Sequence, residues 1–142
     1  MTINAILSGR SGPVHTASPD ESVADVVARL TDLRIGAVPV VDGDTVVGIF
    51  SERDLVHCLA SEGAAALNRK IVEVMTSPVV GIAGDADVMS ALSLMTQRRF
   101  RHLPVIEAGQ LLGFVSIGDL VKYRIERIEA EAAAMRDYIA GA

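Results

Sequence analysis

A segment of this chain repeats once at a fixed spacing. When residues 5–56 are laid over residues 70–121 without a gap, 14 of the 52 positions are identical. The stretches GIFSERD at 48–54 and GFVSIGD at 113–119 share a frame of glycine, two apolar residues, serine, two variable residues and aspartate. Self-similarity at one period indicates a repeat architecture. We therefore expect two copies of one unit, over 1–65 and 66–122, followed by an unrepeated segment over 123–142.

The hydrophobic pattern of the first copy predicts four elements. Residues 16–33 have helical spacing, with Ser18 as the expected N-cap and Glu21 completing a capping box. The β-branched runs AVPVV and TVVGIF are separated by DGD, which is typical of a hairpin. A second helix is expected to begin at Ser51 and end near Gly63. With a short extended lead-in (PVHT, or PVVGI in the second copy), each copy is predicted as a βαββα unit of the α/β (α+β) class. Two such units should pack through their sheets, because neither can bury both faces of so short a sheet.

Composition excludes several classes of function. The net charge of −5 argues against a general nucleic-acid binder, so nucleic acid is an unlikely partner. No apolar run approaches the roughly 18 residues that span a bilayer, and the first residues lack the features of a signal peptide, so we expect no membrane association. The single cysteine, Cys58, cannot form an internal disulfide. A lone thiol suits a reducing compartment, and we expect a cytoplasmic protein.

Reactive residue types do not form a catalytic or metal-binding pattern in the sequence. The histidines His15, His57 and His102 are scattered, with no cysteine or carboxylate at metal-ligand spacing, so we expect no metal site. Neither a P-loop nor a glycine-rich dinucleotide fingerprint is present. Cys58 is expected to be a small buried hydrophobe, and its neighbour His57 would point about 100° away on a helix. We expect no catalytic residues and no enzymatic activity.

The repeated unit resembles a known family. The signatures GAVPVVDGDTVVGIFSERDLV and RHLPVIEAGQLLGFVSIGDLV resemble those of paired cystathionine-β-synthase (CBS) domains, also called Bateman modules. The resemblance covers residues 1 to about 122 and is strongest to small stand-alone CBS pairs with a helical C-terminal extension. It implies a pseudo-two-fold pair with two clefts, and many members bind AMP, ADP, ATP, S-adenosylmethionine or NAD. The implied function is a regulatory sensor that requires no cofactor and signals to a partner by conformational change. The alternative is a ligand-independent dimeric adaptor that acts through the C-terminal helix.

The repeated frame fits an adenosine ligand chemically. An ionised carboxylate can accept hydrogen bonds from both hydroxyls of a ribose, which makes Asp54 and Asp119 the candidates for ribose binding. The frame glycine would leave room for the sugar, and the frame serine at a helix start could contact a phosphate. These positions are Gly48, Ser51, Gly113 and Ser116. Helix capping by serine and aspartate remains open as an alternative explanation of the frame.

The resemblance also implies where the base would lie. Each cleft would take its base pocket from the lead-in strand of the other copy. The Asp54 cleft would use Val80 and Ile82, and the Asp119 cleft would use His15 and Ala17.

The two clefts are expected to differ in charge. The stretch QRRFRH before Pro104 is strongly basic, whereas the matching DLRIGA carries only Arg34. Because arginine favours phosphate, the cleft with Asp54, Arg101 and His102 should hold a phosphorylated ligand more tightly, helped by Arg53. The other cleft should prefer a less charged adenosyl ligand or stay empty. A solvated helix end is the alternative for QRRFRH.

The unrepeated segment predicts a long amphipathic helix. Its apolar residues recur at alternating spacings of four and three, as in the a/d seam of a coiled coil. We call Val121, Ile125, Ile128, Ala132, Met135 and Ile139 the apolar seam. We favour an isologous homodimer in which the two helices pack across the interface. Docking to an unknown protein target and folding back onto the same chain remain alternatives.

Overall fold

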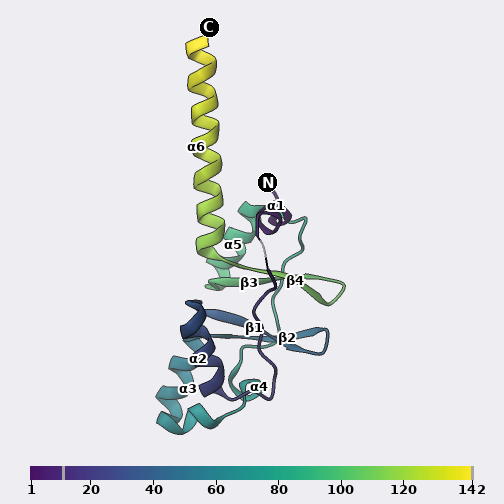
Figure 1. Cartoon of the computed structure of the whole chain (residues 1–142), viewed down its shortest axis with the longest axis vertical. Coiled ribbons are helices and arrows are strands. Elements are labelled where there is room, and N and C mark those ends of the chain that lie inside the picture. Colours follow the sequence, from purple (N-terminus) through teal and green to yellow (C-terminus); the bar gives the residue numbers. More distant parts are fainter. Residues whose placement is uncertain (11, 142) are drawn as a thin grey trace.

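The computed structural model describes residues 1–10 and 12–141. Two antiparallel hairpins lie one above the other, helices flank them, and one long helix extends away from the body (Figure 1). The elements in chain order are α1 (Ile3–Ser8), α2 (Val23–Leu33), β1 (Ala37–Asp42), β2 (Thr45–Ser51), α3 (Glu52–Glu62), the 3₁₀ helix η1 (Gly63–Asn68), α4 (Ile71–Val74), α5 (Val88–Arg98), β3 (His102–Glu107), β4 (Gln110–Ser116) and α6 (Ile117–Gly141).

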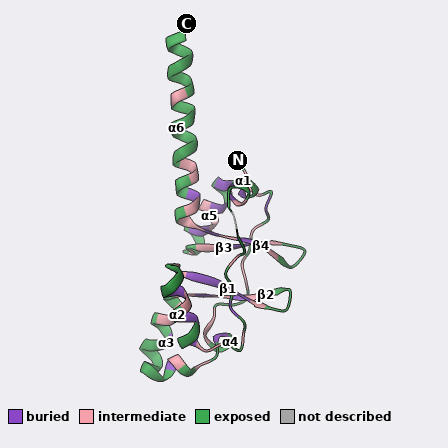
Figure 2. Ribbon diagram, viewed as in Figure 1, coloured by how far each residue is buried: buried purple, intermediate pink, exposed green. Residues whose placement is uncertain are grey.

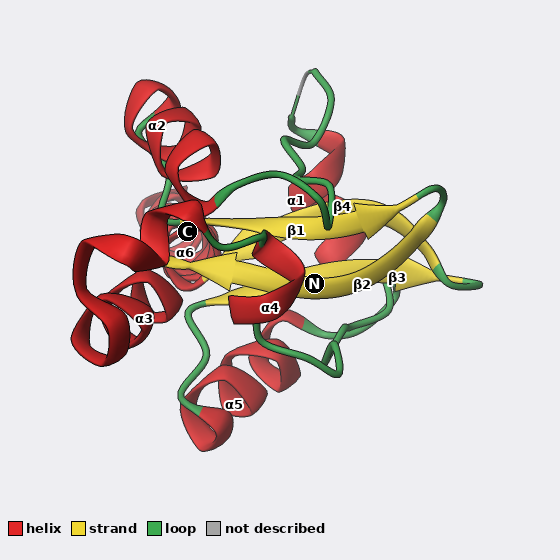
Figure 3. Cartoon of the chain, turned by 90° about the horizontal axis from the view of Figure 1, so that it is seen from below, coloured by secondary structure: helices red, strands yellow, loops and turns green. Residues whose placement is uncertain are grey.

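The hairpins confirm the predicted α/β (α+β) fold of two repeated units. Strand β1 pairs with β2, β3 pairs with β4, and the two hairpins contact each other through β2 and β4. Each lead-in forms a single parallel bridge rather than a full strand: Ala17 pairs with Val40, and Ile82 pairs with Val105. The view from below shows the two hairpins stacked with helices around them (Figure 3). Each unit is therefore βαββα with its first strand reduced to one bridge.

The start of α2 differs from the sequence prediction. Ser22, not Ser18, is the N-cap, and its hydroxyl accepts a hydrogen bond from the backbone N–H of Asp25 at 3.1 Å. The Ser18 N–H does donate to the Glu21 carboxylate at 2.8 Å, but this bond closes a turn before the helix. The backbone is held extended here because Ser22 pairs with Lys70. The capping box expected at Ser18 was therefore wrong as a helix start, since tertiary pairing overrides the local signal.

Each unit has its own hydrophobic core, but the short helices cross between them. Ile71, from α4, is fully buried among Val26, Val38 and Phe50 of the first unit. The equivalent helix α1 places Ile3 and Ile6 in the core of the second unit. In Figure 2, buried segments appear on the strands and on the short helices α1 and α4. The crossing binds the two units together, and it brings each lead-in beside the other unit's hairpin.

The helices that follow the repeated frames begin as predicted. Ser51 caps α3, and Gly63 ends it with a positive φ of 65°. Helix α6 runs without a break for 25 residues from the end of β4, which confirms the expected long C-terminal helix. Most of α6 is exposed and lies outside the body (Figure 2). In the part of the chain that the structure describes, no helix is both long enough and apolar enough to cross a membrane.

Candidate functional site

The first cavity lies where the start of α3 meets the second unit. It has a volume of about 170 Å³. Its walls come from the end of β2 and the start of α3 on one side, and from the lead-in and the α5–β3 connection of the second unit on the other. The lining residues are Gly36, Ile49, Ser51, Glu52, Arg53, Asp54, Thr76, Pro78, Val79, Val80, Arg99, Phe100, Arg101 and His102. Six of the predicted site residues therefore come together here, namely Ser51, Arg53, Asp54, Val80, Arg101 and His102.

The carboxylate of Asp54 is held by three donors. The backbone N–H and the hydroxyl of Ser51 donate to Oδ2, at 2.8 and 3.1 Å, and the hydroxyl of Thr76 donates to Oδ1 at 2.7 Å. Ser51 and Asp54 form a complete capping box, so helix capping accounts for the serine and the aspartate of this frame. A carboxylate has about four acceptor positions, so capping leaves capacity for a ligand. Sequence reasoning missed Thr76, because its contact with Asp54 depends on tertiary packing.

The positive charge at this cavity comes from arginines. Arg53, Arg99 and Arg101 are exposed at its rim, and Arg53 donates to the backbone carbonyl of Arg99 at 3.1 Å. The imidazole of His102 stacks on Phe114, with ring centroids 5.6 Å apart and planes 10° from parallel. Burial lowers the pKa of His102 below its ordinary value despite nearby carboxylates. His102 therefore offers a neutral hydrogen-bonding ring rather than a counter-charge.

The second cavity is larger, at about 570 Å³, and lies against the start of α6. Asp119, Ser116, Gly113, His15 and His102 from the predicted set line it. The remaining lining residues are Leu7, Arg10, Gly12, Pro13, Val14, Arg34, Ile35, Gly36, Ala37, Leu112 and Phe114. The lead-in of the first unit therefore forms one wall, and the second unit's frame forms the other.

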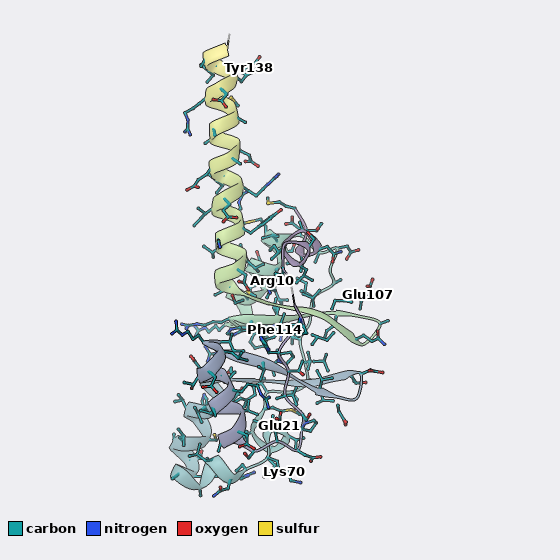
Figure 4. The ribbon with its side chains drawn as sticks, viewed as in Figure 1. Arg10, Glu21, Lys70, Glu107, Phe114 and Tyr138 are labelled. Atoms are coloured by element: carbon teal, nitrogen blue, oxygen red, sulfur yellow. The ribbon has the colours of Figure 1, made fainter. Side chains whose placement is uncertain are left out.

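Arg10 occupies the carboxylate of this second cavity. Its guanidinium forms an ion pair with Oδ2 of Asp119 at 2.5 Å and donates to the carbonyl of Phe114. Figure 4 shows Arg10 and Phe114 close together near the start of α6. Burial alone would raise the pKa of Asp119, but hydrogen bonds from Ser116 and Arg10 outweigh it and lower that pKa below its usual range. Asp119 is therefore ionised at neutral pH and already partnered.

The two clefts differ less in positive charge than the sequence predicts, because Arg10 also lines the second cavity. Sequence reasoning assigned only Arg34 to the second cleft, whereas the structure adds a second arginine to its lining. At the equivalent position, the repeat alignment places Met75. No local motif marks Arg10, and its role follows from the crossing of the short helices, since Arg10 follows α1.

The frame glycines accommodate protein side chains rather than open space. A Cβ atom at Gly48 would meet the side chain of Met75, and one at Gly113 would lie 2.5 Å from Leu7 Cδ2. The requirement for glycine thus arises from packing against the other unit's short helix, through Leu7 in α1 and Met75 at the end of α4. Gly48 is outside the lining of the first cavity, whereas Gly113 lines the second.

Two predicted base-pocket residues do not line either cavity. Ala17 is buried in the first unit's core, and its backbone hydrogen-bonds to Pro39 and Val41. Ile82 packs against the second unit's core and pairs with Val105. The structure brings Val80 and His15 to the cavities, but not Ala17 or Ile82. Alternation along a strand does not separate these residues, because the two members of each pair are two positions apart and would share a face. Ala17 and Ile82 are the bridged positions and pack in the cores, so only the earlier member of each pair reaches a cavity.

Two residues form a wall between the cavities. Gly36 and His102 line both of them, and a Cβ atom on Gly36 would lie 3.6 Å from Cε1 of His102.

Among the described residues, no group of three or more His, Cys, Asp and Glu side chains is arranged to hold a metal ion.

Comparison with known proteins gives consistent relatives. A "CBS domain-containing protein CBSX3, mitochondrial" of Arabidopsis thaliana is 32% identical over 127 residues, which covers 86% of this chain and 62% of the relative. The chain thus spans less than two thirds of that relative's length. A CBS-domain containing protein of Agrobacterium tumefaciens has a crystal structure with a TM-score of 0.82 and 41% identity, covering 87% of this chain and 92% of the other. The structure of CBSX2 in complex with AMP has a TM-score of 0.71 and 26% identity, covering 80% of this chain and 88% of the other.

A family model supports the same assignment. The model of the CBS domain matches twice, at residues 10–61 and 71–126, so it accounts for most of the chain. Both matches include the repeated frame and its hairpin. The chain therefore belongs to the CBS domain family and carries two CBS domains in tandem.

Proposed function

We propose that this protein is a regulatory module that binds an adenosine-containing ligand in the clefts between its two CBS repeats and signals to a partner by conformational change. One observation carries the proposal: the aspartate of each repeated frame lines a cavity whose opposite wall belongs to the other repeat. The affinity of a ligand that contacts both walls would depend on how the two repeats are positioned relative to each other. AMP, ADP, ATP, S-adenosylmethionine and NAD are the candidate ligands, and we infer no catalytic step.

The first cavity offers a complementary part for each portion of a nucleotide. Val80 and Ile49 supply apolar surface for a base, and the partly buried Asp54 supplies a carboxylate for a ribose. Arg99 and Arg101 at the rim suit a phosphate. The volume of about 170 Å³ is below the roughly 300–1,000 Å³ of typical ligand sites, so the phosphates would lie outside, among the arginines.

The structure of CBSX2 in complex with AMP supports the proposal, because that protein shares the fold and holds an adenosine nucleotide. The second cavity is large enough for a nucleoside, but a ribose would have to displace Arg10 from Asp119. We therefore expect the first cleft to bind phosphorylated ligands more tightly.

A binding screen with matched variants tests the proposal. Thermal shift and calorimetry would be run with AMP, ADP, ATP, S-adenosylmethionine, NAD and GTP on the wild type, Asp54→Asn and Asp119→Asn. Asparagine keeps an acceptor for the helix cap but removes the charge that would bind ribose. Asp87→Asn is the control, because Asp87 caps α5 through Met89 outside both cavities. Stabilisation by adenosyl compounds that is lost in Asp54→Asn and retained in Asp87→Asn supports a sensor. No response to any ligand from folded wild type contradicts it.

A second candidate function is a ligand-independent dimeric adaptor. The exposed apolar seam of α6 favours it, because a surface of this kind is expected to be covered by a partner. We propose that the protein is a homodimer in either case, and that it acts in the cytoplasm, since its single cysteine is a buried free thiol. Unaltered dimerisation and partner binding in a chain that binds no nucleotide would favour the adaptor.

A further inference from the structure

Helix α6 carries charged residues on both sides of its apolar seam. With Ile125, Ala132 and Ile139 at heptad position a and the other seam residues at d, one flank is position e and the other is position g. Position e holds Lys122, Glu129 and Arg136, and position g holds Arg124, Glu131 and Tyr138. In a two-stranded coiled coil, these flanks set both the partner and the direction of pairing.

The seam is free of the chain's own body. Leu120 is buried and Tyr123 packs on the second unit's core, so this side of the helix faces the body. The five large seam residues, Val121, Ile125, Ile128, Met135 and Ile139, are 42% to 66% exposed. Tyr138 marks the far end of the helix, well away from both hairpins (Figure 4). A second helix can therefore lie along the seam without displacing the body.

We propose that α6 pairs with α6 of a second copy in a parallel, in-register coiled coil. In that arrangement, each g residue meets the e residue five positions further along the partner. Arg124 then meets Glu129, and Glu131 meets Arg136. Both contacts join opposite charges, and the two-fold symmetry makes each of them twice. All six seam positions also meet their own counterparts.

The antiparallel alternative has the opposite charge pattern. When two antiparallel helices overlap along the whole seam, Ile125 lies opposite Met135, and equivalent flanks face each other. Glu129 then faces Glu129, and Lys122 faces Arg136. A shifted antiparallel register can restore opposite charges, but it leaves part of the seam uncovered. The full seam is therefore compatible with attractive flanks only in the parallel pair.

The occupant of the seam is a second copy because the helix supplies both halves of each ion pair. This inference rests on the homodimer proposed above and adds its direction and its determinants. It places the two-fold axis along α6, with both pairs of CBS domains at the same end of the dimer. It does not depend on any nucleotide.

Charge reversal tests the flanks in the full-length chain without nucleotide. The variant R124E/R136E has only acidic charges at the four contact positions, and E129R/E131R has only basic ones. Sedimentation equilibrium should show a dimer for the wild type and a Kd raised at least about tenfold for each variant alone. An equimolar mixture of the two should recover dimers. Asp137→Arg is the matched control, because this exposed charge lies at position f, away from the seam.

Circular dichroism separates loss of pairing from loss of helix, since E129R/E131R also removes the Arg127–Glu131 ion pair within one helix. A monomeric wild type overturns the inference. So does a dimer that both charge variants leave unchanged, and a heteromeric partner found on the seam in its place.

A cysteine at the seam tests direction. In the parallel pair, Met135→Cys lies beside its own counterpart and should form a disulfide on mild oxidation. In the fully overlapping antiparallel pair, the two cysteines are offset by about 15 Å along the axis, beyond disulfide reach. The wild type is the control because its only cysteine, Cys58, is buried in the body. A dimer that does not cross-link contradicts the parallel arrangement. A crosslinked dimer that fails the ligand screen leaves this inference intact and removes only the sensor.

Discussion

Replacing Arg10 by alanine should lower the stability of the protein slightly and leave the Asp119 carboxylate in the second cleft available to a ligand. The guanidinium pairs with Asp119, and the two side chains are 38% and 39% exposed. Exposed ion pairs contribute about 0.2–1 kcal/mol, and the bond to the Phe114 carbonyl adds a similar amount. We therefore expect Arg10→Ala to cost about 1 kcal/mol of unfolding free energy, which lowers Tm by about 3 °C.

The same change should raise the affinity for adenosine. A ribose must compete with Arg10 for Asp119, so removing the arginine returns about 1 kcal/mol to binding, or about fivefold in Kd. Adenosine is the most discriminating ligand for this test, because it has no phosphate for Arg10 to attract and reports only on the competition for Asp119. Calorimetry in an Asp54→Asn background would isolate the second cleft.

Arg34→Ala is the matched control for this experiment, since Arg34 also lines the second cavity but forms no ion pair with Asp119 among the described residues. AMP should gain less than adenosine from Arg10→Ala, because the arginine is also its phosphate counter-charge. Unchanged or weaker adenosine binding in Arg10→Ala, with Arg34→Ala behaving alike, would refute the reasoning that Arg10 blocks the ribose site.

Three further predictions concern stability. Ile71→Ala should cost about 2–5 kcal/mol in urea unfolding because the residue is fully buried, whereas the 45% exposed neighbour Val72→Ala should cost little; equal costs would contradict the crossing of α4. Gly48→Ala should cost about 1–3 kcal/mol, since its Cβ would meet Met75 and the Thr76 carbonyl; an unchanged midpoint would mean that this segment moves freely. Burial lowers the pKa of His102 in the folded state, so the unfolded state takes up its proton at higher pH. Stability should therefore fall as the pH drops through about 6.5, and His102→Phe should weaken that fall in urea titrations at each pH.

The sequence predicted the repeated elements because each leaves a local signal. Hairpins, helix caps and the amphipathic tail are encoded in spacing and turn residues, and the structure reproduces them. The start of α2 was predicted wrongly because Ser18 and Glu21 match a local capping pattern. The pairing of Ser22 with Lys70 keeps the backbone extended there, so the helix begins later.

The candidate site was only partly visible in the sequence. Both aspartates stand in a repeated frame, so the sequence marked them directly. Arg10 and Thr76 reach these aspartates from the segments that follow the short helices α1 and α4 of the other unit, and no pattern in one unit specifies that contact. The frame glycines were expected to leave room for a sugar, but the space beside them is filled by the side chains of Met75 and Leu7.

One helix connects the second cleft to the proposed dimer interface. Asp119 lies in the first turn of α6, and Val121, two residues later, begins the apolar seam. A ligand that replaces Arg10 on Asp119 would change what anchors this turn to the segment after α1. If the ligand binds the dimer and the monomer with different affinity, linkage requires dimerisation to change ligand affinity by the same factor. Sedimentation with and without saturating adenosine, and calorimetry above and below the dimer Kd, must then give matching ratios. Equal dimer Kd values in both conditions would show that the cleft and the seam act independently.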